Sequence, residues 1–222
     1  MLCQKDKQTL SAPGRESLFR DAASLKATMQ GYRREFHRNP ELSMQEFGTC
    51  HRIKQILSEL GIEVQRQYTE PAVVALMRGG AGPGPTVAFR ADMDGLPILE
   101  KNSIPYKSSV PGVMHASGHD AHMAILLGLA HLLKPRLESM RGNVKLIFQP
   151  GEETPHPGGA FQLIQEGVLL NQRWTIYLPI IFISRCPRTP YAFPTVYPWL
   201  QPTTLSCWWR GAAARSRSRR QE

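Results

Sequence analysis

The chain has 222 residues, enough for one full domain or for one domain and part of a second. Its hydrophobic fraction of 41% allows a real core, and no apolar run is long enough to span a membrane. Four cysteines without C-x-x-C spacing argue against a disulfide framework and against a zinc knuckle. The net charge of +9 would suit nucleic-acid binding if the basic residues were spread over the folded part of the chain.

The positive charge is concentrated in the last 50 residues. Residues 173–222 hold eight arginines and one acid, so they account for +7 of the total. All four tryptophans and six prolines lie there, and neither helical nor strand periodicity persists. We therefore expect a disordered basic tail in preference to an arm that binds RNA or acidic lipid. An edge strand within residues 176–183 is the alternative, because Pro179 argues only against a central strand.

Helices alternate with strands over residues 15–172, which predicts a layered α/β domain. Residues 1–14 are expected to be an N-terminal extension, and they lack the apolar core of a signal peptide, which favours a cytoplasmic protein. The pattern predicts helices over 18–36, 47–60, 123–133 and from 160 to near Gly167, and strands over 62–64, 72–77, 86–89 and 144–148.

Three short runs contain the side chains that bind metals. The first, residues 114–122, concentrates His115, His119, His122 and Asp120 before the apolar helix. The spacing alone does not indicate which of these histidines binds, and a single histidine is more often a satisfied surface or core residue than a ligand. Three histidines with an aspartate around a glycine favour the ligand interpretation, because imidazole and carboxylate are ligands of zinc, manganese and cobalt.

The other two runs follow predicted strands. Glu152 and Glu153 come after the strand over 144–148, and Asp92 and Asp94 come after the strand over 86–89. Two adjacent glutamates are usually an exposed pair, and an Asp-x-Asp-Gly run is often only a turn. Active sites of open α/β sheets lie at the carboxyl ends of strands, and three such clusters in one chain make coincidence the weaker explanation.

Together these runs resemble the M20 family of metallopeptidases, in the amidohydrolase branch of hippurate hydrolases, N-acyl-amino-acid deacylases and auxin-conjugate hydrolases. The similar segments are Phe36-His37-Arg38-Asn39-Pro40-Glu41-Leu42-Ser43, residues 90–98, residues 114–122, residues 149–153, and 158–169. They occur in the family's order over residues 30–170. The resemblance implies a mixed sheet with helices on both faces, as in the catalytic domain of M20 zinc peptidases.

The resemblance also implies roles for individual residues. His119 and Glu153 correspond to metal ligands, Glu152 to the general base, and Asp94 to the aspartate that orients a ligand. Ser117 stands where this branch usually has a metal-binding cysteine, and a hydroxyl is a far weaker ligand than a thiolate. The implied reaction is metal-dependent hydrolysis of the amide bond of an N-acyl amino acid, with two divalent ions, zinc or manganese, in the intact site.

Other features of the family are missing from the sequence. The chain has no histidine after His156, whereas the family supplies further histidine ligands, and it lacks the inserted dimerisation domain and the returning half of the catalytic domain. We therefore expect an incomplete catalytic domain over 15–172 and a non-homologous, disordered or frameshift-derived tail over 173–222. A truncated, inactive fragment is the alternative function. The expected partner is a small N-acyl amino acid substrate, without nucleic acid, membrane or the family's dimer interface.

Overall fold

The computed structural model of the protein describes residues 12–155, 157–170 and 174–179. Within these residues, helices and strands alternate along the chain as the sequence pattern predicts. In chain order they are α1 (Ala12–Ser24), α2 (Lys26–Arg38), α3 (Phe47–Glu59), β1 (Glu63–Val64), β2 (Val73–Arg78), β3 (Thr86–Asp92), α4 (His119–Leu133), the 3-10 helix η1 (Lys134–Ser139), β4 (Asn143–Gln149), α5 (Gly159–Gln165) and β5 (Trp174–Pro179).

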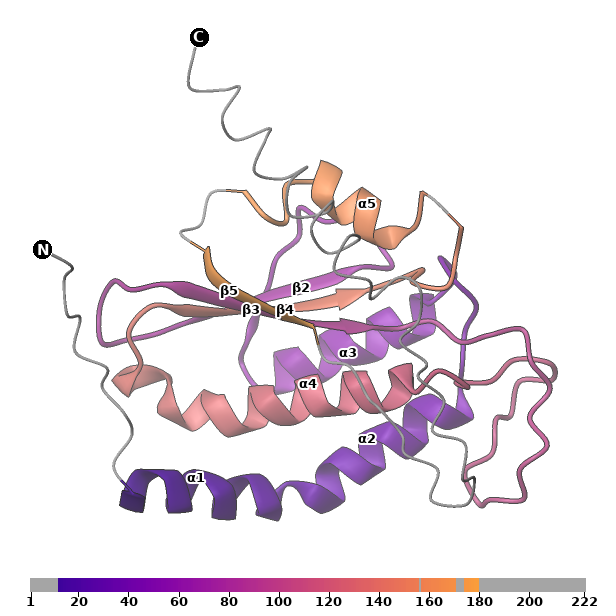
Figure 1. Ribbon diagram of the computed structural model, residues 1–222, viewed down its shortest axis with the longest axis horizontal. Coiled ribbons are helices and arrows are strands. Elements are labelled where there is room, and N and C mark those ends of the chain that lie inside the picture. Colours follow the sequence, from indigo (N-terminus) through magenta and orange to yellow (C-terminus); the bar gives the residue numbers. More distant parts are fainter. Residues whose placement is uncertain (1–11, 156, 171–173, 180–222) are drawn as a thin grey trace, which may run out of the picture. The chain divides into compact units, whose positions relative to one another are not determined.

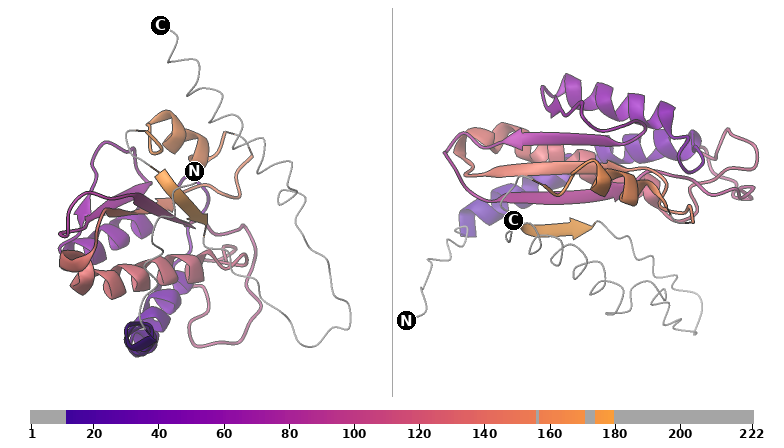
Figure 2. Two further views of the ribbon diagram at one scale, coloured as in Figure 1. Left: turned by 60° about the vertical axis from the view of Figure 1, so that its left-hand side comes forward. Right: turned by 90° about the horizontal axis from the view of Figure 1, so that it is seen from above.

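The strands form one mixed sheet in the order β1-β2-β4-β3-β5. β2 pairs antiparallel with β1 and β4, whereas β3 runs parallel to both β4 and β5. Figure 2 shows β3 and β4 side by side in the middle of the sheet. Their register pairs Asp92 with Gln149, so both strands end at the same edge of the sheet. The segments that follow the two strands therefore start next to each other.

Helices cover both faces of the sheet, which confirms the predicted architecture. In Figure 1, α2, α3 and α4 lie on one face, and the orange helix α5 lies on the other. Side chains of β4 alternate between the two cores, since Leu146 and Phe148 belong to the larger core and Ile147 to the smaller. The larger core includes Ile53 and Leu57 of α3 and, from α4, the residues Met123, Leu126 and Leu127.

Two helices differ from the sequence prediction. The helix expected over 18–36 is two helices, because the chain turns at Leu25 between α1 and α2. The helix expected to begin at Met123 begins at His119, so the polar run before the apolar stretch forms the first turn of α4. Apolar periodicity reports only the buried positions that are apolar, and it therefore misses a first turn whose buried residues, His119, Asp120 and His122, are polar.

The sheet continues past residue 172, where the predicted catalytic domain ends. β5 pairs with β3 from Trp174 to Pro179, so the edge strand considered as the alternative is present. α1 begins at Ala12, within the expected extension 1–14. Residues 1–11 and 180–222 lie outside the described residues, and the separate origin of the tail stays a prediction.

Among the helices of the described residues, none combines the length and the hydrophobicity that crossing a bilayer requires.

We predict that Phe148→Ala destabilises the protein by about 3–5 kcal/mol, because the ring is fully buried in the central strand and its loss leaves a cavity. Phe161→Ala is the matched control, since that ring on α5 is 47% exposed and should cost about 1 kcal/mol or less. Urea unfolding followed by circular dichroism measures both changes. Equal losses in the two variants would contradict the central position of β4 in the core.

Candidate metal centre

The three polar runs meet at the edge of the sheet where β3 and β4 end. Asp94 follows β3, Glu152 and Glu153 follow β4, and His119 opens α4. Gly118, just before α4, has φ +89°, a conformation that glycine adopts without a steric penalty. This backbone turn places the first residue of α4 against the loops that follow the two strands.

His119 is the centre of the group. Its Nδ1–H donates to the carbonyl oxygen of Asp94 at 2.9 Å, which leaves Nε2 directed at carboxylates. From Nε2 the nearest carboxylate oxygens are Oδ1 of Asp92 at 3.5 Å, Oε2 of Glu152 at 3.9 Å and Oε1 of Glu153 at 4.0 Å. The predicted convergence of His119, Glu152 and Glu153 is therefore confirmed by the distances.

Ser117 also belongs to this group. Its hydroxyl is exposed and donates to the Glu153 carboxylate. The serine therefore lies beside the expected ligand, at the position that the family resemblance assigned to a metal-binding side chain. The Ser117 hydroxyl oxygen therefore already has a hydrogen-bond partner, the Glu153 carboxylate.

Asp94 connects the histidine with the loop after β4. One carboxylate oxygen, Oδ2, accepts hydrogen bonds from the Ser43 hydroxyl at 2.6 Å and from the Glu153 backbone N–H at 2.8 Å. Oδ1 lies 3.2 Å from Nδ1 of His119. Burial opposes ionisation of Asp94, but the hydrogen bonds from His119, Ser43 and the Glu153 N–H outweigh it and lower its pKa to about 2.

Charge around His119 favours a cation at its Nε2. Burial alone would lower the pKa of His119, but the hydrogen bond to Asp94 and the charges of Asp92, Asp94 and Glu152 raise it to about 9. Burial, followed by the charge of Asp92, raises the pKa of Glu152 above its usual value. A carboxylate with a raised pKa is a better general base near neutral pH.

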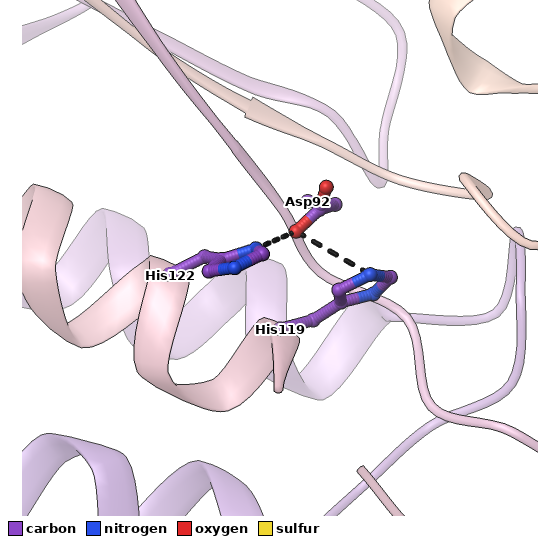
Figure 3. A group of neighbouring side chains, drawn as sticks. All are labelled: Asp92, His119 and His122. Atoms are coloured by element: carbon purple, nitrogen blue, oxygen red, sulfur yellow. Dashed lines mark hydrogen bonds and ion pairs between the residues drawn. The ribbon is translucent and has the colours of Figure 1, made fainter. Parts of the chain in front are cut away.

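Asp92, His119 and His122 form a second, fully buried group that overlaps the first (Figure 3). The Nδ1–H of His122 donates to Oδ1 of Asp92 at 2.5 Å. On the other side, Nη1 of Arg90 lies 3.0 Å from Oδ2 of Asp92. Burial raises the pKa of Asp92, but the hydrogen bond from His122 and the charge of Arg90 lower it overall. The sequence placed both residues in polar runs without indicating this contact, because nothing in their spacing reports which helical turn faces β3.

The donor set around Nε2 of His119 suits a divalent ion. Bonds of about 2.0–2.2 Å in a tetrahedral site place two ligands about 3.3–3.6 Å apart. The separations from Nε2 to Asp92, Glu152 and Glu153 lie close to this range, whereas the 2.5 Å between His122 and Asp92 is too short for two ligands of one ion. His122 is therefore a hydrogen-bond partner that holds Asp92 in place.

The other two polar residues of the same run, Asp120 and His115, have surroundings of their own. Asp120 accepts from Arg33 at 2.9 Å and contacts His37 at 2.7 Å, and the other nitrogen of His37 lies 3.2 Å from Glu100. His115 is buried, and burial lowers its pKa to about 4. Neither ring nitrogen of His115 has a hydrogen-bond partner among the described residues. The three histidines of the run thus have three different environments, and only His119 directs a nitrogen at the two glutamates.

Comparison with known proteins identifies the family. Residues 88–189 match the family model described as peptidase family M20/M25/M40, so the match extends beyond residue 172. Over 155 residues the chain is 46% identical to thermostable carboxypeptidase 2 of Saccharolobus solfataricus. This alignment covers 69% of the chain and 39% of the carboxypeptidase. Over 147 residues the chain is 44% identical to N-acetyl-L-cysteine deacetylase of Bacillus subtilis, and this alignment covers 66% of the chain and 35% of the deacetylase.

A solved structure agrees with these matches. The crystal structure of a dinuclear metal-binding peptidase of family M20 from Bacillus subtilis aligns with a TM-score of 0.65 and 38% sequence identity, and it covers 71% of this chain and 43% of that one. The chain thus spans between 35% and 43% of the length of these three proteins. The matched residues include Asp92, His119 and both glutamates of the centre. On sequence, fold and the arrangement of these side chains, the chain belongs to the M20 family of metal-dependent hydrolases.

Proposed function

We propose that the chain binds divalent metal at the edge of its sheet and hydrolyses the amide bond of an N-acyl amino acid. The observation that carries this proposal is the placement of Nε2 of His119 within 4.0 Å of three carboxylates, one of which, Glu152, is 41% exposed and has a raised pKa. The deacetylase among the relatives is named for an N-acetyl amino acid, which supports this substrate class.

His119, Glu153 and Ser117 are the proposed metal-binding residues, and Asp92 is a further oxygen donor within reach of the same position. Divalent ions at this position would polarise the acyl carbonyl and lower the pKa of water, and the donor set suits zinc or manganese. The relative described as dinuclear supports a site for two ions. Asp94 accepts from Nδ1 of His119 and thereby keeps Nε2 free for the ion.

Glu152 is proposed as the general base. Its carboxylate is exposed, so substrate and water can reach it, and among the described residues no N–H or O–H group donates a hydrogen bond to it. It would take a proton from the attacking water and return it to the nitrogen of the leaving amino acid. Glu153, in contrast, is held by hydrogen bonds: its backbone N–H donates to Asp94, and its carboxylate accepts from the Ser117 hydroxyl. The two neighbouring glutamates are therefore suited to different roles.

The proposal is tested by turnover. The full chain with Mn²⁺ or Zn²⁺ should release free amino acid from a panel of N-acetyl-L-amino acids, and chelation should abolish the release. Glu152→Gln should lower the rate roughly 100-fold or more while metal affinity is retained, since only the base is removed. Glu153→Gln should weaken metal binding itself. Metal binding without turnover in any condition would favour the alternative, a catalytically inactive metal-binding chain.

A second prediction concerns Ser117. We expect Ser117→Cys to bind Zn²⁺ more tightly than the native chain, by roughly tenfold or more, because a thiolate bonds strongly to a borderline-soft ion. Isothermal titration calorimetry measures the two dissociation constants. Ser117→Ala is the control and should change the affinity little if the hydroxyl is a weak ligand. Equal affinities in the cysteine variant and the native chain would show that position 117 does not contact the ion.

A third prediction concerns pH. The raised pKa of His119 means that metal-free protein holds a proton on this ring at neutral pH, and the ion must displace it. Mn²⁺ affinity should therefore rise by up to about tenfold for each pH unit between pH 6.5 and 8.5, and level off near the pKa of about 9. Calorimetry in two buffers of different ionisation enthalpy should report close to one proton released per ion at neutral pH. Binding without proton release would contradict His119 as a ligand.

A further inference from the structure

The short segment between α2 and α3 contacts the loop that follows β3. The carbonyl oxygen of Glu41 accepts the backbone N–H of Gly95 at 2.7 Å, and the Ser43 hydroxyl donates to Asp94 at 2.6 Å. Leu42 forms an isolated β-bridge with the same glycine. These contacts hold the Asp94 loop from a segment about fifty residues earlier in the chain.

The same segment also contacts the loop that follows β4. Glu46 is fully buried, and one of its carboxyl oxygens accepts the backbone N–H of Gly151 at 2.7 Å. The Met44 side chain lies against the same glycine, where a Cβ atom would come within 2.6 Å of its sulfur. Gly151 has φ +57° and directly precedes Glu152, so both contacts act on the turn that carries the two glutamates.

Burial of the Glu46 carboxyl group is unfavourable for the stability of the folded chain. Its second carboxyl oxygen has no hydrogen-bond partner among the described residues, and the charged neighbour that affects it most is Asp94, which has the same sign. Burial raises the pKa of Glu46 to about 7, against its usual 4.5. A buried carboxyl group without a cationic partner is costly, and an apolar side chain would fill the same space more favourably. The backbone N–H groups that Glu46 contacts are those of Met44 and Glu46 in its own segment and that of Gly151 in the loop after β4, so Gly151 is the contact that reaches the metal centre.

We propose that residues 41–46 form a brace that sets the position of the Asp94 loop relative to the Glu152–Glu153 loop, with Ser43 and Glu46 as positioning residues of the metal centre. The inference rests on the proposed function, because it assigns the brace to that same site. The hydrogen bond from the Glu153 N–H to Asp94 links the two loops directly at one point. Ser43 and Glu46 add one hydrogen bond from the same segment to each loop, so both loops are held against a common support, as residues around metal ligands commonly do.

Glu46 is tested by a conservative and a disruptive variant. Glu46→Gln keeps an oxygen that accepts from Gly151, and its Mn²⁺ affinity should stay within about threefold of the native chain. Glu46→Leu fills the space but removes the acceptor, and it should weaken Mn²⁺ binding about tenfold or more. Hydrogen exchange at the Gly151 amide should accelerate in the leucine variant and stay slow in the glutamine variant.

Glu41 provides the matched control. It lies in the same segment, but its carboxylate accepts from the backbone N–H groups of Gly48 and Thr49 at the start of α3 and contacts neither metal-site loop. Glu41→Gln should therefore lower the unfolding temperature at most, with unchanged Mn²⁺ affinity and unchanged exchange at Gly151. Ser43→Ala, a small change at a half-buried position, tests the other arm of the brace if Glu46→Leu fails to fold, and it should also weaken Mn²⁺ binding.

The outcomes separate the brace from the proposed function. If the glutamine and leucine variants of Glu46 bind Mn²⁺ as the native chain does, and Ser43→Ala does too, the brace does not position the site and the inference fails. If the native chain binds no metal, the proposed function fails. Exchange at Gly151 then still decides the brace: acceleration in Glu46→Leu alone supports it as a positioning device for the loop, and unchanged exchange overturns it.

Discussion

The parallel pairing of β3 with β4 is the constraint on which the centre depends. It makes two strands whose last residues are 57 positions apart in sequence end at one edge, with Asp92 opposite Gln149. Because the polar residues directly follow these strands, the pairing alone brings the aspartates and the glutamates into one region. The start of α4 at the same edge then adds the histidine. A parallel pair of this kind needs a long crossover, and α4 together with η1 lies in the connection between the strands.

Concentrated negative charge is the chemical consequence of this arrangement. Four carboxylates surround one buried imidazole, and the native chain compensates them in part with the charge of Arg90, a hydrogen bond from His122 and a protonated His119. Such a cluster is unfavourable for folding by itself, because like charges in a poorly solvated region repel one another. A divalent cation would relieve this repulsion, which is the physical reason that the cluster and metal binding belong together.

The sequence pattern identified most of the fold and of the centre, but not all of it. Strong apolar runs such as residues 144–148 and 123–133 correspond to β4 and to the body of α4, since buried elements have a clear pattern. The break at Leu25 was not visible, and an edge strand near β5 was foreseen only as the alternative to a disordered tail, because both features depend on packing against distant residues. Within residues 114–122 the three histidines looked equivalent, yet His115, His119 and His122 have different partners.

The sequence by itself determined the kinds of side chain available and their order along the chain, and with them the family and the identity of His119, Glu152, Glu153, Asp94 and Ser117 as candidates. These are local properties, because a motif is a run of neighbouring residues. Only the tertiary structure decided that His122 holds Asp92, that Asp120 turns away toward His37, and that Glu46 reaches Gly151. Those contacts join residues between 30 and 105 positions apart, and their geometry follows from strand register and helix position, which no local pattern records.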